Sequence, residues 1–260
     1  MKKTLLWSVP LLCSALLLTS PVAAVEADAS CTGQLKTLAK SLHPKHKLSE
    51  ELSTCKVWPY SADKTIMVIM LADPTQNDPY DQTWDIDVVV TDTTSGKVVA
   101  RNHTLRAIQD NAVFTSQVTI DTARYQLTPG LRAFGVRFTH RGSSRVNPFN
   151  IESLSLYAMR DQALPMVLNH FIMNETGGEW DGNCAGTLSE KKRTLSVLKS
   201  SRHGFADLKV QSKTSESISK VDARGECQIK ETSNKQTDLI LRYDGKRYPI
   251  GKDNRFDNAP

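Results

Sequence analysis

The chain has 260 residues, of which 39% are hydrophobic and 23% are charged, and its formal net charge is +5 at pH 7. This length allows one good hydrophobic core or two small ones. Acidic and basic residues are interspersed, apart from the triplet Lys191-Lys192-Arg193, so the sequence lacks the concentrated basic face typical of a nucleic-acid-binding protein.

The first 24 residues have the pattern of a cleavable signal peptide. Lys2 and Lys3 form a positive start, Leu5–Leu18 is apolar, and the segment ends in small residues at Ala24. The apolar run contains Pro10 and is shorter than the roughly 20 residues of a membrane span, so an uncleaved anchor is the less favoured alternative. We therefore expect a periplasmic protein whose mature chain has no membrane span and carries 31 basic and 28 acidic residues.

The cysteine count agrees with export. Cleavage removes Cys13 and leaves four cysteines, an even number that predicts two disulfides in an exported chain. We expect Cys31 to pair with Cys55, and Cys184 to pair with Cys227. The sequence contains no Cys-x-x-Cys motif, which argues against thiol redox catalysis.

Residues 25–60 are expected to form a helical hairpin closed by the first of these disulfides. Apolar residues recur there at helical spacing, at Leu35, Leu38, Ala39 and Leu42. His43-Pro44 ends this first helix, and Ser49–Leu52 begins a second one with acidic residues in its first turn. A bridge between Cys31 and Cys55 would stabilise the hairpin by about 3 kcal/mol.

The pattern changes to strands after residue 60, so residues 61–176 are predicted to form a β-rich domain. Thr65–Leu71 is a continuous apolar run, typical of a strand that is covered on both faces, and Trp84–Val90 is rich in β-branched residues. Further strands are expected over residues 97–100, 113–120, 131–140 and 151–159. Residues 164–172 fit a strand or a helix, and we favour a strand.

A second β-rich domain is predicted over residues 177–260. Its boundary is placed at Gly177-Gly178, where a loop rich in turn-forming residues begins and runs to Gly186. Strands are expected over residues 193–198, 205–211, 226–231 and 239–243. Asp244-Gly245, followed by residues 246–250, is the strongest hairpin signal in the chain, and the tail after Gly251 is expected to fray. The predicted fold class is mainly β, an antiparallel meander or sandwich (a partial propeller is a variant), with the short N-terminal helical hairpin.

One short segment carries a family resemblance. His203-Gly204-Phe205-Ala206-Asp207-Leu208-Lys209-Val210 resembles the closing half of an FG-GAP-like propeller repeat, whose strands often read Gly-aromatic-x-Asp-Leu-x-Val. The calcium loop that usually precedes this half is replaced by Lys199-Ser200-Ser201-Arg202, so the resemblance transfers no calcium role. It implies that Asp207 lies at a strand entry and accepts hydrogen bonds from turn amides.

Oxygen ligands are densest in the segment 73–87. Six residues contribute them: Asp73, Asn77, Asp78, Asp81, Asp85 and Asp87. Calcium binds six to eight oxygens, but the Asp-x-Asp-x-Asp-Gly order of a calcium loop is missing here. We favour a solvated loop that caps a strand, and whether the segment binds calcium stays open.

No catalytic motif stands out in the sequence. It contains no Gly-x-Ser-x-Gly elbow and no His-Glu-x-x-His pair. Glu179 and Asp181 flank Trp180, which a carbohydrate-active site could use, although a packed tryptophan in a loop is the simpler interpretation. We therefore predict no enzyme, no cofactor and no metal.

The function predicted from these features is a non-catalytic binding or inhibitory module of the bacterial envelope. Candidate binding residues lie in or beside the long loops 73–87, 141–150 and 175–187, and they are Trp84, Arg141, Arg145 and Trp180. The expected partner is an envelope protein or a glycan, not a nucleic acid. The alternatives are a structural accessory of an envelope or secretion machine and, less favoured, an envelope-polymer hydrolase that uses Glu179 and Asp181. The identity of the ligand and the oligomeric state stay open.

Overall fold

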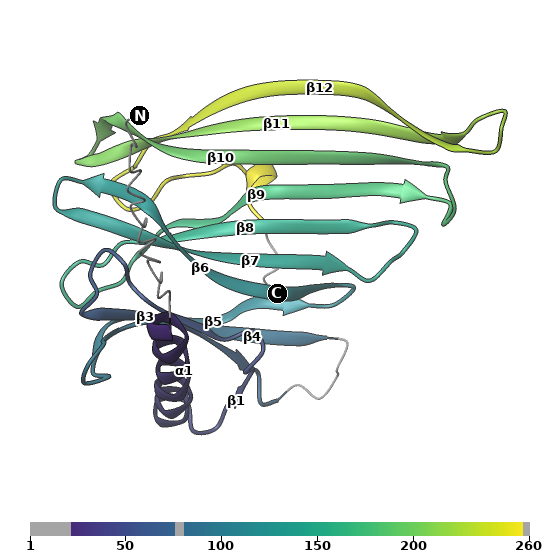
Figure 1. The fold of residues 1–260 in the computed structure, drawn as a ribbon. Helices are drawn as coiled ribbons and strands as arrows, with labels where there is room; N and C mark the ends of the chain where they lie inside the picture. Colours follow the sequence, from purple (N-terminus) through teal and green to yellow (C-terminus); the bar gives the residue numbers. More distant parts are fainter. Residues whose placement is uncertain (1–21, 76–80, 257–260) are drawn as a thin grey trace, which may run out of the picture.

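The computed structural model describes residues 22–75 and 81–256, which form one long helix and two antiparallel sheets (Figure 1). The helix is α1 (Val22–Leu42), and a short 3-10 helix, η1 (Lys252–Asn254), lies near the C-terminus. The strands are β1 (Lys47–Leu48), β2 (Thr54–Val57), β3 (Lys64–Ala72), β4 (Gln82–Asp92), β5 (Val98–Asp110), β6 (Val113–Thr128), β7 (Leu131–Gly142), β8 (Phe149–Tyr157), β9 (Met166–Trp180), β10 (Gly186–Arg202), β11 (Phe205–Val221) and β12 (Cys227–Leu241).

The smaller sheet has the order β1-β3-β4-β5, and β2 also pairs with β3. Helix α1 covers one face of this sheet, where Leu35 and Ala39 pack on Ile69 and its neighbours (Figure 1). The other face packs on the larger sheet, where Val68 and Phe138 belong to one core cluster. Strand β3 is therefore buried on both sides, which explains its unbroken apolar run and confirms the strand expected over residues 65–71.

The larger sheet is a meander in the order β12-β11-β10-β9-β8-β7-β6 (Figure 1). A second core cluster lies at one end of its strands, where Leu154, Phe171, Leu208 and Tyr248 are buried together. The long strands β10, β11 and β12 continue away from this core. The expected fold class, mainly β and antiparallel, is confirmed, and the segment 164–172, for which we favoured a strand, lies largely in β9.

The expected N-terminal helical hairpin is only half formed. Its first helix is α1, but Ser49–Leu52 is a turn, in which the Ser49 hydroxyl accepts a hydrogen bond from the Leu52 amide at 3.3 Å. The chain then enters β2, where Cys55 pairs with Met67 of β3. The prediction of a second helix is wrong because residues 54–57 pair with β3, so their backbone hydrogen bonds are made in the sheet and not in a helix. The expected signal peptide, residues 1–24, lies outside the described residues except for its last three residues, which belong to α1.

The predicted domain boundary at Gly177-Gly178 lies inside a strand. Strand β9 runs through both glycines to Trp180, and it pairs with β8 on one side and β10 on the other. The turn between β9 and β10 covers only residues 181–185. The larger sheet therefore contains strands from both of the segments that were predicted as separate β-rich domains.

The predicted hairpin at Asp244-Gly245 forms its turn but not its second strand. The Asp244 carboxylate accepts the amide hydrogens of Lys246 and Arg247, at 2.7 and 2.8 Å. The Tyr248 amide then donates to the Val167 carbonyl of β9, at 2.7 Å, instead of pairing back. The tail beyond Gly251 is also fixed as far as Phe256, whose amide donates to the His170 carbonyl at 3.0 Å, so the expectation of fraying is wrong for these residues.

Both predicted disulfides are confirmed within the described residues. The Cys31–Cys55 bridge joins α1 to β2 across a Cα–Cα distance of 6.1 Å, and the Cys184–Cys227 bridge spans 5.7 Å. Two disulfides indicate that the protein folds in an oxidising, exported environment. In the part of the chain that the structure describes, no helix has the length and hydrophobicity needed to cross a membrane.

Candidate functional site

Three turns meet at one end of the larger sheet, which we call the distal end. They are the β7–β8 loop (143–148), the β9–β10 turn (181–185) and the β11–β12 turn (222–226), all at the right of Figure 1. The Cys184–Cys227 disulfide ties the second turn to the first residue of β12. The covalent link and the strand pairing together hold the distal end in one arrangement.

Each of the two later turns is closed by an aspartate. The Asp181 carboxylate accepts hydrogen bonds from the amides of Asn183 and Cys184, both at 2.8 Å. These backbone donors stabilise the ionised carboxylate, so they lower the pKa of Asp181. Asp222 closes the β11–β12 turn in the same way, by accepting from the Glu226 and Arg224 amides. Both carboxylates are therefore used to build turns.

Two glycines allow β9 and β10 to approach each other closely at this end. A Cβ atom on Gly178 would overlap the carbonyl oxygen of Thr187, and one on Gly186 would overlap the carbonyl oxygen of Glu179. The Gly186 position also lies under the Trp180 indole, whose Cδ1 is 3.2 Å from where a Cβ would be. Glycine at position 186 therefore makes room for the indole to lie across the strand.

Strand register places an apolar group on one face of the distal end. Trp180, Gly186, Ser219 and Ile229 are paired in adjacent strands, so their side chains share a face, and Leu188 lies two residues along β10 on that face. Trp180 is 43% exposed, Leu188 46% and Ile229 74%. With Arg145 and Pro148 of the β7–β8 loop, these residues line a cavity of about 390 Å³. We call Arg145, Pro148, Trp180, Leu188 and Ile229 the platform.

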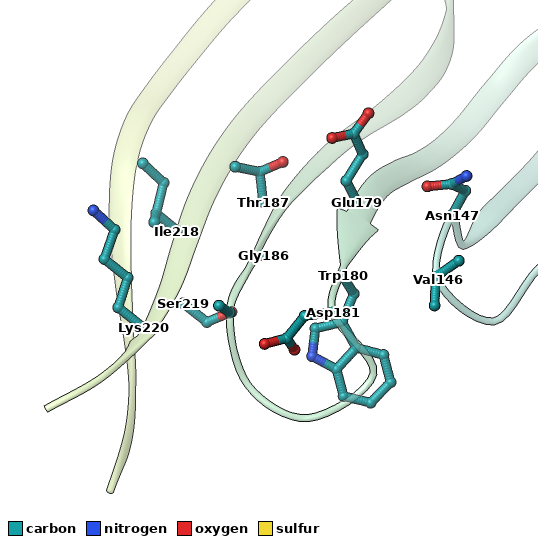
Figure 2. Close-up of a pocket in the computed structure, with 11 residues that line it drawn as sticks. Val146, Asn147, Glu179, Trp180, Asp181, Gly186, Thr187, Ile218, Ser219 and Lys220 are labelled. Atoms are coloured by element: carbon teal, nitrogen blue, oxygen red, sulfur yellow. The ribbon is translucent and has the colours of Figure 1, made fainter. Parts of the chain in front are cut away.

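The opposite face of the same strands is more polar. Glu179, Thr187 and Ile218 point to the side away from the Trp180 indole (Figure 2). A wider cavity, of about 610 Å³, extends around the strand ends, where Glu179, Trp180 and Lys220 all line it. Glu179 and Asp181 differ in their surroundings: Glu179 points to this more polar face (Figure 2), whereas the ionised Asp181 carboxylate accepts hydrogen bonds within its turn.

The structure brings together two of the four predicted binding residues. Arg145 and Trp180 both belong to the platform. Arg141 is exposed at the end of β7, next to the same loop but outside the platform. Trp84 lies in the smaller sheet, where its indole donates a 2.7 Å hydrogen bond to Asp110 and its ring packs on the core. Trp84 therefore has a packing role.

Three platform residues, Pro148, Leu188 and Ile229, were not predicted from the sequence. Leu188 and Ile229 are single apolar residues between polar ones, so no apolar stripe marks this end of their strands. They lie on the same face as Trp180 because of the strand register, which the three strand pairings and the Cys184–Cys227 disulfide fix. The signal available in the sequence was Ile229, which lies two residues after Cys227, a cysteine that was predicted to form a disulfide.

The segment 73–87 divides between a turn and a buried strand. Asp73 accepts from the Thr75 amide and hydroxyl, and Asp87 is fully buried in β4. Arg101 donates to both Asp87 oxygens, at 2.9 and 2.8 Å, and His43 Nε2 lies 2.8 Å from one of them. Asn77 and Asp78 lie outside the described residues. Among the residues that are described, no group of three or more potential ligands could hold a metal ion.

Asp207, singled out by the propeller-repeat resemblance, lies near the start of β11 and is buried. One of its oxygens accepts a hydrogen bond from the Ser200 hydroxyl of β10, at 2.8 Å. The other has no hydrogen-bond partner among the described residues. The expected bonds to turn amides are therefore replaced by a bond to a serine on the neighbouring strand.

Comparison with known proteins places the chain in no family. No family model, no curated protein and no solved structure matches it.

Proposed function

We propose that this chain is an exported, non-catalytic binding or inhibitory module of the bacterial envelope, and that its ligand contacts the platform. Export is supported by the signal-peptide pattern of residues 1–24 and by the two disulfides. We place the protein in the periplasm on the same grounds.

The observation that carries the proposal is the exposed apolar group on a rigid frame. Trp180, Leu188 and Ile229 come from three different strands and share one face. Isolated exposed apolar residues are common, but a group of them beside an arginine is typical of an interaction site. The disulfide and the turn-closing aspartates fix the backbone before binding, which lowers the entropic cost of association.

The chemistry of the platform suits an envelope protein or a glycan. The Trp180 indole offers a flat apolar surface with a polar N–H, which suits an apolar side chain or the carbon face of a sugar ring. Arg145 adds a guanidinium that pairs well with a carboxylate. The proposal needs neither a cofactor nor a nucleic acid.

The test compares three forms of the mature, disulfide-bonded protein. Immobilised wild type, Trp180→Ala and Leu105→Ala are exposed to soluble peptidoglycan fragments, envelope oligosaccharides and a detergent-free periplasmic extract. Leu105 is the matched control because it is also exposed and apolar but lies on β5, in the smaller sheet. We expect a ligand that wild type and Leu105→Ala retain equally and that Trp180→Ala loses by about tenfold or more.

Two outcomes would count against the proposal. One is a ligand that binds wild type and Trp180→Ala equally. The other is turnover of a glycan by the wild-type protein that Glu179→Gln abolishes, because this would restore the hydrolase alternative.

A further inference from the structure

Strand β12 is the last strand of the larger sheet and pairs on one side only, with β11. Every residue of β12 is exposed except Leu241. Within the described residues, its outer edge therefore presents backbone N–H and C=O groups to solvent. Such an edge is a template on which another extended chain can pair.

Most of this edge carries features that discourage pairing. The β11–β12 register shifts at Thr232, which is a bulge, and charged residues surround it at Lys230, Glu231 and Lys235. Bulges and charges are the usual protection of an exposed edge. The last residues differ, because Leu239 and Ile240 are apolar and 39% and 41% exposed.

A groove lies beside this unprotected end. It is a cavity of about 460 Å³ between the end of β12 and the C-terminal segment. Leu239 and Ile240 line it from β12, and Pro249 and Ile250 line it from the segment that follows the Asp244 turn. We call this feature the edge groove. It combines an open strand edge with a cavity large enough for side chains, which is the arrangement used in strand addition.

The edge groove is positively charged. Arg202 and Arg242 line it, both are exposed, and neither forms an ion pair in the part of the chain that the structure describes. The one carboxylate on the lining, Asp244, already accepts hydrogen bonds from the amides of Lys246 and Arg247. The charge that complements this groove is negative.

We propose that the edge groove binds an extended acidic polypeptide segment, which adds a strand to the Leu239–Leu241 end of β12. An extended polypeptide is the partner whose N–H and C=O groups repeat at the spacing of a strand edge. Side chains alternate between the two faces of a sheet, so the apolar side chains of the segment pack on Leu239, and its carboxylates, on the face of Ile240, pair with Arg202 and Arg242. This inference does not depend on the platform, which lies at the other end of the strands.

The test uses a defined probe, a capped seven-residue peptide that alternates valine with glutamate. Binding to the mature protein is measured by calorimetry, together with three control ligands: the same peptide with lysine for glutamate, the valine–glutamate peptide with N-methylated backbone amides, and vesicles that contain an anionic lipid. We expect saturable binding of the acidic peptide alone. The variant Arg202→Glu/Arg242→Glu should lower its affinity by about tenfold or more, whereas Trp180→Ala should leave it unchanged.

Both arginines are exposed, so the charge-reversal variant should keep the wild-type melting temperature, which is measured as a check on folding. The inference is overturned if the acidic peptide does not bind, if the lysine or N-methylated peptide binds as well, or if charge reversal has no effect. It is also overturned if the vesicles bind through the same arginines, or if sedimentation shows that a second copy of the chain occupies the groove. A failure of either proposal leaves the other intact, because Trp180→Ala and the arginine pair report on opposite ends of the sheet.

Discussion

The stability of this protein should fall steeply with acidification because of one buried histidine. His140 of β7 is fully buried, and its Nδ1 lies 3.3 Å from the Thr115 hydroxyl. Its Nε2 has no hydrogen-bond partner in the described structure. The Phe256 ring packs on the imidazole, with 4.2 Å between the two ring centroids. Burial lowers the pKa of His140 to about 3, and the nearby His170 contributes to the same shift.

The direction of the effect follows from proton binding. In the unfolded chain the pKa is near its usual 6.5, so below this pH the unfolded state takes up a proton that native His140 does not. The free energy of unfolding therefore falls as the pH drops below 6.5, and the loss is complete once the pH is below 3. A pKa of about 3 implies a loss of about 2 kcal/mol at pH 5 and about 5 kcal/mol at the acid limit.

The assay is urea unfolding at pH 7, 6 and 5 for wild type, His140→Asn and His203→Asn. The asparagine at position 140 keeps a polar atom near Thr115 but does not titrate. His203 is the control because it is exposed in a turn with φ of 50°, a conformation that asparagine tolerates. Wild type and His203→Asn should lose about 2 kcal/mol more than His140→Asn between pH 7 and pH 5. Equal losses in all three proteins would show that His140 does not cause the pH dependence.

Three further changes test the frame of the molecule. Replacing Cys184 and Cys227 with serine should lower the free energy of unfolding by about 4 kcal/mol in the chain-entropy model, since the bridge spans 43 residues, and thermal unfolding with and without reductant checks this. Gly186→Ala should destabilise the protein by about 1–3 kcal/mol through its clash with Glu179, whereas Gly177→Ala, which meets no atom within 4 Å, should be close to neutral in urea unfolding. Asp87→Ala should cost about 3 kcal/mol in the same assay because it leaves a partly buried guanidinium without its carboxylate.

Local sequence patterns predicted the strands well where burial decided them. Thr65–Leu71 is apolar throughout because α1 and the larger sheet cover its two faces, whereas a strand with one solvated face would alternate apolar and polar residues. The disulfide pairing was also predictable, because four cysteines in two well-separated groups favour local bridges.

The errors arose where distant strands decided the local structure. Ser49–Leu52 has a good helix start, but β3 takes the following residues into a sheet. Asp244-Gly245 has a good hairpin turn, but Tyr248 finds its partner in β9, about 80 residues earlier in the chain. No short window of sequence contains these partners.

The candidate site was half predictable for a related reason. Arg145 and Trp180 stand out as an arginine and a tryptophan in loop-like sequence, whereas Leu188 and Ile229 become significant only when the register places them beside the indole. Trp84 has the same residue type as Trp180, but its partner Asp110 lies on the neighbouring strand and fixes it in a packed position. Residue type alone did not separate the two tryptophans.

Amide hydrogen exchange of the ligand-bound protein shows whether a ligand occupies the platform. With any ligand recovered by the binding screen, we expect slower exchange confined to the distal end, over residues 143–148, 178–188 and 227–231. Protection confined to α1 and strands β1–β5, or no change at the distal end on saturation, would contradict this expectation.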